Sequence, residues 1–333
     1  MYKISIIMPI FNTEKYIERS FKSILNQTMD LKDIEVIMVD DCSTDNTRNI
    51  VKKYEKKYDN FRGVYHEKNS GGCAVPRNSG LKVANGEYVM FLDPDDEYAP
   101  DMCETLYNKI KNSDAKVVKC NHELITPESS KIDYQYDTSI SEVILDPKID
   151  TPPTSVSVCN AIHDLNFLSE NNFTFPILKN AEDLIFTLRE FFNSNKVIIL
   201  NNYAGYKYYT NPEISHSKKA TKENLDIILN ACFTGKDIIE QNNRTDIYHD
   251  FFSAYCFQFF IRILNYTGDK KEYFKRFYEF EKSLNCTLTF KYQWINIVNK
   301  FIIKNKISTA VFVFNAFNSI RKTPFIKIYR KTI

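Results

Sequence analysis

The chain has 333 residues, of which 43% are hydrophobic and 26% are charged, so its composition is that of a globular protein and excludes a wholly disordered one. This length predicts two domains or one large domain. With only 8 glycines and 11 prolines, collagen-like and low-complexity architectures are also excluded.

The eight cysteines contain no Cys-x-x-Cys pair and no Cys/His cluster with the spacing of zinc ligands. Several lie in apolar runs, and a reducing compartment is the simplest interpretation. The apolar run before Pro9 is too short for a signal peptide, and no stretch approaches the about 18 apolar residues of a transmembrane helix. We therefore expect a cytoplasmic protein.

The charge is unevenly distributed along the chain. Residues 282–333 carry ten Lys or Arg and no Asp or Glu, so the remainder of the chain is acidic. A basic, aromatic tail predicts a polyanionic partner: a phosphate polymer, a nucleic acid or an anionic membrane surface. Because no recognised nucleic-acid-binding motif accompanies the charge, nucleic acid is not the expected partner.

Apolar runs and helical patterns alternate over the first 120 residues. Strands are predicted at Ile4–Met8, Val36–Val39, Gly63–Tyr65, Tyr88–Leu92 and Val117–Cys120. Helices are predicted at Glu14–Gln27, Asp45–Tyr58 (capped by Ser43 or Thr44), Val75–Ala84 and Ala99–Asn112. This alternation predicts an α/β fold whose mostly parallel sheet is flanked by helices.

The pattern changes twice in the rest of the chain. Residues 121–153 are polar and predict loops and edge structure. A helix starting near Asn180 and a strand at Val197–Leu200 follow. Three aromatic helices without intervening strands are then predicted, at Leu225–Gln241, Asp250–Leu264 and Lys271–Leu284. We therefore expect one domain at 1–217 and a smaller, helical and basic one at 218–333.

Acidic residues follow the predicted strands at the point where ligands bind in an open parallel sheet. Asp93 and Asp95 come after one strand and can together hold a divalent cation that also binds substrate phosphates. The alternative is a solvated acidic turn. Asp41 follows another strand and is either an acceptor for a base N–H or an ordinary turn residue.

Three further positions each allow a functional and a structural interpretation. Arg77 follows a glycine pair and suits a pyrophosphate or a carboxylate, or else is a solvated helix residue. Asp183 is either a general base or, as the third residue of a helix capped by Asn180, part of a capping arrangement. His216 is a metal or phosphate ligand, or a solvated loop histidine.

Five segments, in order across residues 5–186, resemble the motifs of glycosyltransferase family 2, the nucleotide-sugar enzymes of GT-A fold. They are SIIMPIFNTEKYIERSFKSILNQT, VIMVDDCSTDNT, NSGGCAVPRNSGL, GEYVMFLDPDD and NAEDLIF. Within this family, the Val-Pro-Arg-Asn and Ala-Glu-Asp-x-x-Phe segments are most similar to wall-teichoic-acid poly(ribitol-phosphate) β-N-acetylglucosaminyltransferases.

For the nucleotide, the resemblance implies roles for five residues. Pro9 and Phe11 would shape the uridine pocket, and Asp41 would hold the uracil. Asn69 and Arg77 would approach the nucleotide.

For the chemistry, the resemblance implies a metal site and a base. Asp93, on the ribose side of the donor, and Asp95 would ligate Mn2+ or Mg2+, and His216 would join them near the diphosphate. Asp183 would be the catalytic base of an inverting transfer, with Glu182 beside it in the donor site.

The resemblance thus implies a metal-dependent transfer of GlcNAc, or another hexose or N-acetylhexosamine, from a UDP-sugar. The acceptor would be a hydroxyl of a polymeric or lipid-linked envelope glycan, such as teichoic acid or a surface polysaccharide. The basic helices at Gln293–Phe317 pack their own core, form a homo-oligomer interface, or present a cationic surface to the acceptor or to the inner face of the membrane.

Three other functions compete with this one. A nucleotidyltransferase or a dehydrogenase would need a glycine-rich loop after the first strand, where this chain has Pro9-Ile10-Phe11-Asn12. The alternative of a different class is a non-catalytic module, derived from such an enzyme, that binds a nucleotide sugar or a polyanion. The presence of all four acids, Asp41, Asp93, Asp95 and Asp183, argues against it.

Overall fold

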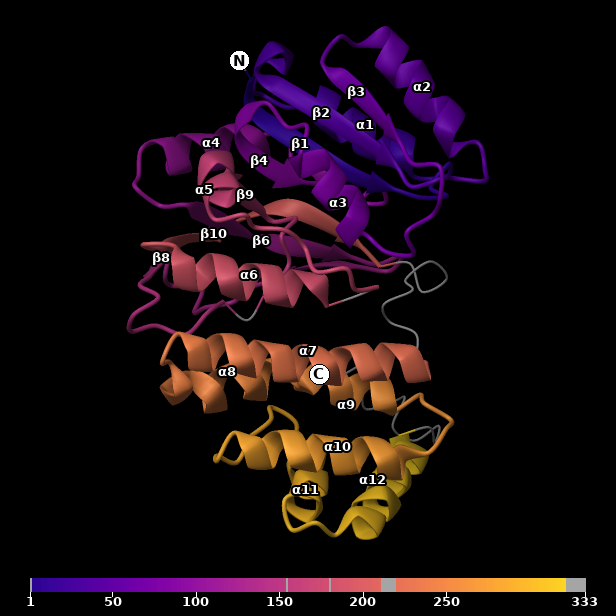
Figure 1. Ribbon diagram of the computed structural model, residues 1–333, viewed down its shortest axis with the longest axis vertical. Coiled ribbons are helices and arrows are strands. Elements are labelled where there is room, and N and C mark those ends of the chain that lie inside the picture. Colours follow the sequence, from indigo (N-terminus) through magenta and orange to yellow (C-terminus); the bar gives the residue numbers. More distant parts are fainter. Residues whose placement is uncertain (1, 154, 180, 211–219, 322–333) are drawn as a thin grey trace. The chain divides into compact units, whose positions relative to one another are not determined.

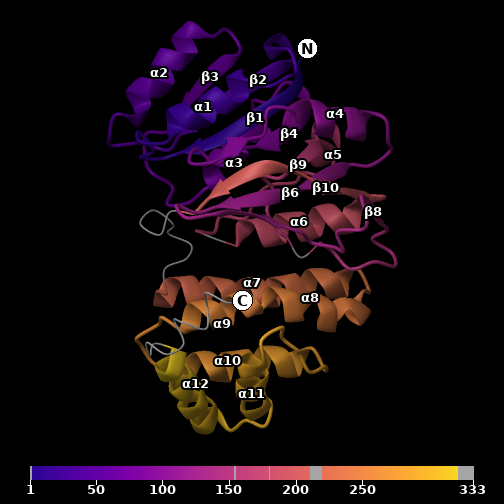
Figure 2. The ribbon, with the colours of Figure 1, turned by 180° about the vertical axis from the view of Figure 1, so that it is seen from behind.

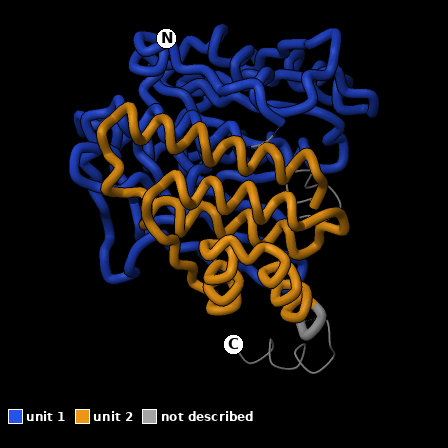
Figure 3. The backbone as a smooth tube through the Cα atoms, turned by 60° about the horizontal axis from the view of Figure 1, so that its bottom comes forward, with its two compact units in different colours: residues 1–215 blue, residues 216–333 orange. Residues whose placement is uncertain are grey.

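The structure is a computed structural model that describes residues 2–153, 155–179, 181–210 and 220–321 (Figure 1). Contacts within the chain divide it into two compact units, Met1–Ser215 and His216–Ile333 (Figure 3). Each unit is described by itself.

A mixed sheet forms the centre of the first unit. Its strands are β1 (Tyr2–Ile10), β2 (Ile34–Asp40), β3 (Phe61–Tyr65), β4 (Gly86–Phe91), β5 (Glu97–Tyr98), β6 (Val117–Ile125), β7 (Ser130–Asp133), β8 (Glu142–Leu145), β9 (Ala161–Asp164) and β10 (Val197–Tyr209). Their order is β3-β2-β1-β4-β9-β6-β10-β5, with β7 on β6 and β8 on β10. The pairs within β3-β2-β1-β4 and the pair β6–β10 are parallel, and the pairs made by β5, β7, β8 and β9 are antiparallel.

Helices cover this sheet, as the α/β prediction requires. They are α1 (Ile17–Leu25), the short η1 (Leu31–Asp33), α2 (Thr47–Lys57), α3 (Ala74–Leu81), α4 (Met102–Lys111), α5 (Leu165–Glu170) and α6 (Glu182–Asn193). The chain runs outward through the sheet from β1 to β3 and then returns to β4. Because such crossovers are right-handed, α1 and α2 lie on one face of the sheet and α3 lies on the other (Figures 1 and 2).

Continuous apolar runs make the central strands. All seven residues of β2 and the last seven of β1 are buried, which is the pattern of a strand covered on both faces. Residue Ile7 pairs with Ile37 on one side and with Phe91 on the other, so the register places large side chains next to one another across the sheet centre.

Two predicted boundaries are wrong for identifiable reasons. The helix predicted from Ala99 begins at Met102, because residues 97–98 pair with β10 and the Ala99 amide donates to the Gly205 carbonyl. The helix predicted to be capped by Ser43 or Thr44 has Asn46 at its N-cap position.

The polar segment 121–153 contains more strand than its composition indicates. Strand β6 runs on to Ile125, and β7 and β8 pair with β6 and β10. Sequence patterns also missed β9, whose four residues lie between β4 and β6 and antiparallel to both. So short a strand is determined by its partners rather than by its own pattern.

The second unit is helical. It contains α7 (Lys222–Gln241), η3 (Thr245–Ile247), α8 (Tyr248–Tyr255), α9 (Phe257–Ile263), α10 (Lys270–Ser283), α11 (Gln293–Ile302) and α12 (Ile307–Arg321). The predicted helix Asp250–Leu264 is divided into α8 and α9 at Cys256. The core of the second unit is built from phenylalanine rings, such as those of Phe259 and Phe277, which stack with their ring centres 5.2 Å apart.

No helix in the described part of the chain is both long enough and apolar enough to cross a membrane. All eight cysteines are free thiols. The Sγ atoms of Cys232 and Cys256 lie 3.7 Å apart in the core of the helical unit.

Close packing of α3 on β1 yields a stability prediction. A Cβ atom at Gly80 would collide with the buried side chain of Ile7. We expect Gly80→Ala to lower the free energy of unfolding by about 1–2 kcal/mol in urea denaturation, although alanine normally stabilises a helix by about 1 kcal/mol over glycine. Lys82→Ala, at an exposed position of the same helix end, is the control and should stay within about 0.5 kcal/mol of the unmodified chain. A stabilised Gly80→Ala variant would contradict this packing.

Candidate active site

The carboxyl ends of β1, β2 and β4 meet at one edge of the sheet, because these three strands are parallel neighbours. Pro9 is buried near the end of β1, and Phe11, directly after it, is 42% exposed. Asp41 follows β2, and Asp93 follows β4 after one further residue. The structure thus brings together at this edge the residues that the sequence predicted for it.

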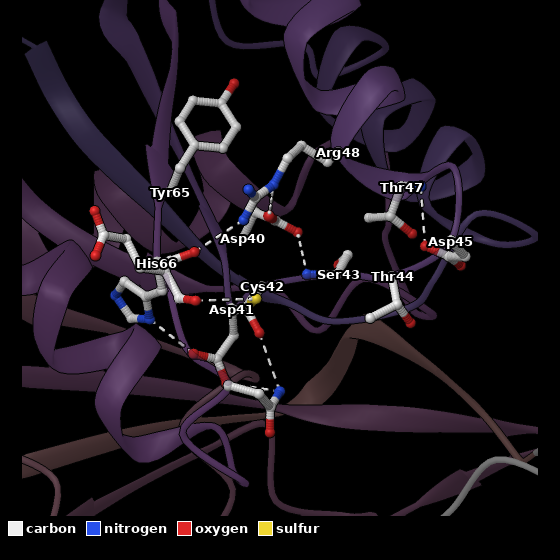
Figure 4. A network of polar contacts seen from close by, with 12 residues as sticks. Asp40, Asp41, Cys42, Ser43, Thr44, Asp45, Thr47, Arg48, Tyr65 and His66 are labelled. Atoms are coloured by element: carbon white, nitrogen blue, oxygen red, sulfur yellow. Dashed lines mark hydrogen bonds and ion pairs between the residues drawn. The ribbon is translucent and has the colours of Figure 1, made fainter.

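The Asp41 cluster consists of Asp41, His66, Asn69 and Ser70. Figure 4 labels Asp41 and His66. One carboxylate oxygen of Asp41 lies 2.7 Å from Nδ1 of His66. The other accepts from the backbone amide and hydroxyl of Ser70, at 2.9 and 2.8 Å, and from the Asn69 amide at 3.1 Å. Asp41 therefore organises the loop that follows β3.

Asp41 keeps the capacity to accept a further hydrogen bond. It is only 2% exposed, yet a carboxylate offers about four acceptor positions, and in the described part of the chain a ring nitrogen of His66 is the one partner of its Oδ1. Its neighbour Asp40 is fully buried and is neutralised by Arg48 at 2.5 Å, so the negative charge available at this end of β2 belongs to Asp41 (Figure 4).

The Arg77 cluster consists of Arg77, Asp93, Glu182 and Asp183. The guanidinium of Arg77, on α3, donates through one nitrogen to Glu182 at 3.0 Å and to Asp183 at 2.6 Å. Its second terminal nitrogen donates to Asp93 at 3.0 Å. Arg77 is 3% exposed, so the alternative prediction of a solvated arginine on a helix is wrong. The partners of Arg77 within the chain are carboxylates, one of the two kinds of partner predicted for it.

The surroundings of Arg77 are largely apolar. Its guanidinium carbon lies 5.3 Å from the centre of the Phe175 ring, and the Sγ of Cys159 is 3.8 Å from one of its nitrogens. Hydrogen bonds to ionised groups are strong in such an environment, so this arginine holds α3, the end of β4 and the start of α6 together.

The start of α6 differs from the capping arrangement that was one interpretation of the sequence. The N-cap residue is Ala181, which has a left-handed φ of 63° and makes no capping hydrogen bond through its side chain. Asp183 is the second helical residue, not the third as predicted, and it binds Arg77. Asn180 and His216 lie outside the described residues.

Burial and neighbouring charges alter the pKa values of the two carboxyl groups on α6. Burial raises the pKa of Asp183, and Arg77 opposes that increase. Burial, followed by the negative charge of Asp183, raises the pKa of Glu182 to about 7, again against the effect of Arg77. Two adjacent carboxyl groups that titrate above their ordinary range are a common property of proton-transfer sites.

The carboxylate groups of Asp93 and Asp95 are of the kind that can share a divalent cation. Arg77 binds Oδ1 of Asp93, and the Asp93 side chain is 30% exposed. No group of three or more Asp, Glu, His or Cys in the described ranges could enclose a metal by itself. Two carboxylates fit Mg2+ or Mn2+, which take their remaining ligands from water and substrate phosphates.

Sequence reasoning missed His66 and Ser70. A signal for His66 existed, because it is the first residue after β3 and so occupies the same strand-end position as Asp41 after β2. Ser70 carried no such signal, since only its contact with Asp41 marks it.

The sequence matches the model of the family described as "Glycosyl transferase family 2" over residues 5–164. It is 35% identical over 227 residues to the poly(ribitol-phosphate) beta-N-acetylglucosaminyltransferase TarP of Staphylococcus aureus strain N315, covering 67% of each chain. The chain belongs to glycosyltransferase family 2. The resemblance found in its motifs is thereby confirmed.

Two other relatives are longer proteins. The chain is 34% identical over 208 residues to a poly(ribitol-phosphate) beta-glucosyltransferase of Bacillus spizizenii, covering 62% of this chain and 32% of that protein. It is 34% identical over 223 residues to TarS of S. aureus strain MW2, a poly(ribitol-phosphate) beta-N-acetylglucosaminyltransferase, covering 66% of this chain and 38% of TarS. The chain thus spans about a third of the length of these two relatives.

Solved structures confirm the fold class. The crystal structure of residues 1–349 of S. aureus TarS with UDP-GlcNAc has a TM-score of 0.74 and 22% identity, and the match covers 95% of this chain and 92% of that one. The same segment with UDP has a TM-score of 0.73, with 22% identity over 95% of this chain and 91% of that one. The GT-A-type architecture with a helical C-terminal region is therefore established, with a mixed sheet in place of a mostly parallel one.

The raised pKa of Glu182 generates a prediction about the pH dependence of stability. Between its ordinary value of 4.5 and about 7, Glu182 binds a proton in the folded chain but not in the unfolded one. The free energy of unfolding should therefore decrease as the pH rises through this window, by roughly 3 kcal/mol from this group. Glu182→Gln should remove that decrease in urea denaturation between pH 4 and pH 8. Glu170→Gln, at an exposed position, should keep it, and equal slopes for the two variants would contradict the assignment.

Proposed function

We propose that this protein transfers a sugar from a UDP-sugar to a hydroxyl group, in a metal-dependent and inverting reaction. The observation that carries the proposal is the Arg77 cluster, in which one buried guanidinium joins Asp93 to Asp183. An acid suited to a metal ion at the donor diphosphate and an acid suited to the acceptor proton are thereby held by the two terminal nitrogens of one arginine.

The nucleotide binds, in this proposal, at the carboxyl ends of β1 and β2. Asp41 accepts from the uracil while His66 and Ser70 keep its carboxylate in place. Pro9 and the half-exposed Phe11 shape the uridine pocket, and Asn69, bound to Asp41, approaches the nucleotide from the loop after β3.

Asp93 and Asp95 hold Mn2+ or Mg2+, and His216 is a further proposed ligand. When bound, the metal neutralises negative charge that develops on the departing UDP. Arg77 acts on the same charge balance from the protein side, because it offsets the carboxylates of Asp93 and Asp183.

Asp183 removes the proton from the acceptor hydroxyl. Its side chain is 22% exposed, so an acceptor can reach it, whereas that of Glu182 is 9% exposed. The bond to Arg77 orients the Asp183 carboxylate and favours its ionised form, while burial raises its pKa toward the working range of a base. Attack on the face opposite UDP then inverts the anomeric carbon.

The relatives supply the basis for the substrates. Their names specify glucose or N-acetylglucosamine as the sugar and poly(ribitol phosphate) as the acceptor, so we propose a UDP-hexose or UDP-N-acetylhexosamine donor and a phosphate-rich envelope polymer, polymeric or lipid-linked. We place the protein in the cytoplasm, where UDP-sugars are available.

The helical unit provides a cationic surface for a polyanion in this proposal. In α11 and the turn after it, Ile295, Val298 and Ile302 are buried, while Lys300 and Lys304 are exposed. The helices thus pack a core of their own and still present lysines to a phosphate-rich acceptor or to the inner membrane surface. The same unit is our candidate for a homo-oligomer interface.

Replacement of the proposed base tests the reaction. Asp183→Asn keeps the size of the side chain but cannot accept the proton, so transfer from UDP-GlcNAc or UDP-glucose to poly(ribitol phosphate) should fall by at least about 10²-fold. The affinity for UDP with Mn2+, measured by calorimetry, should stay within a factor of about two to three, since Asp183 acts on the acceptor. Asp114→Asn, whose side chain is 70% exposed, is the control and should leave both unchanged.

Substantial turnover by Asp183→Asn would contradict the assignment of the base. Binding of UDP-sugar by the unmodified chain, without transfer or hydrolysis, would instead favour the non-catalytic binding module.

A further inference from the structure

Hydrogen bonds to backbone carbonyl groups hold the loop that carries the two proposed metal ligands. This acidic loop, residues 93–97, follows β4. The hydroxyl of Ser20, on α1, donates to the carbonyls of Pro94 and Asp96 at 2.9 and 2.6 Å. Its neighbour Arg19 donates to the carbonyl of Asp95. Three consecutive carbonyl groups of the loop thus point to two consecutive residues of one helix.

A second contact comes from the opposite direction, through the side chain of Asp96. Its carboxylate is 1% exposed and accepts from the hydroxyl of Tyr206 at 2.6 Å and from the backbone amide of Tyr209 at 2.8 Å. Both donors belong to β10. The side chain of the buried Asp96 is therefore held by β10.

Additional contacts join α1 and β10 around the loop. Arg19 pairs with Glu97 at 3.0 Å and stacks on the Tyr209 ring, with its guanidinium carbon 3.6 Å from the ring centre. The Tyr209 hydroxyl donates to Glu97 at 2.8 Å. The loop is thus enclosed by helix and strand together.

We propose that Asp96, Tyr206 and Ser20 are positioning residues that fix Asp93 and Asp95 for the metal and the UDP diphosphate. This inference rests on the proposed function, because it assigns a purpose to a loop whose two half-buried acids we regard as metal ligands. Residues that orient metal ligands commonly influence metal affinity by 10–100-fold without touching the ion.

The geometry explains why a short acidic loop needs this support. Asp93, Asp95 and Asp96 repel one another and would separate in a free loop. Contacts to three carbonyls from α1 and to Asp96 from β10 restrict the backbone, so that the two ligand side chains start from fixed positions. The acidic loop then loses its conformational entropy when the chain folds, and not when the metal and UDP bind.

The test compares two tyrosines of the same strand. Tyr206→Phe removes the hydroxyl that binds Asp96, and Tyr203→Phe removes a hydroxyl that binds Asp101 at a similar 2.6 Å, away from the acidic loop. We expect Tyr206→Phe to weaken Mn2+-dependent UDP binding about 10-fold, and to raise the half-saturating Mn2+ concentration similarly, by calorimetry. Tyr203→Phe should leave both values unchanged. In transfer, KM for the UDP-sugar should rise more than kcat falls.

A second variant and a reference keep the outcomes distinct. Ser20→Ala, which acts from the helix side, should reproduce the loss if Tyr206→Phe proves unstable, and Asp95→Ala gives the effect of losing a ligand itself. If the unmodified chain binds UDP without regard to Mn2+, the proposed metal site fails. If it binds with Mn2+ and both Tyr206→Phe and Ser20→Ala bind equally well, the positioning role alone is overturned.

Discussion

One buried guanidinium holds the candidate active site together. Arg77 binds three carboxylates that come from two distant parts of the chain, the end of β4 and the start of α6. Three negative charges in a largely buried region would be strongly unfavourable alone, because little water is present to solvate them. The arginine makes their proximity tolerable, and removal of its charge would leave them unpaired.

This constraint determines where chemistry can occur. Asp93 is at the edge of the sheet where the Asp41 cluster begins, and Asp183 is on a helix that packs from another direction. Because both bind the same rigid, planar group, the guanidinium restricts their separation in addition to the contacts that hold the acidic loop. A donor and an acceptor bound at these two acids would then meet at a defined distance.

The sequence could predict those parts of the fold and site that depend on local pattern. Apolar runs marked β1, β2 and β4, and the rule that ligands bind beyond parallel strands pointed to Asp41 and Asp93. The same rule, applied to β3, would have found His66. The ion-pair partners of Arg77 could not be predicted in this way, because Arg77 and Glu182 are 105 residues apart and no local pattern relates them.

The errors share a physical cause. At α6, the helix begins one residue later than predicted, after Ala181 in a left-handed conformation, and Asp183 forms a long-range ion pair with Arg77. At β9, four residues became a central strand because β4 and β6 both pair with them. In each case a tertiary contact decided the local structure, which a single sequence does not display.

The most direct test of this account is a thermal-shift series with UDP, GDP and dTDP, each with and without Mn2+. A ligand raises the melting temperature only if the folded chain binds it, so the series reports the nucleotide and the metal together. If Asp41 holds the uracil and the metal holds the diphosphate, UDP should stabilise the chain only with Mn2+, and more than GDP and dTDP do. An equal response to all three nucleotides, or no response to any of them with Mn2+, would contradict it.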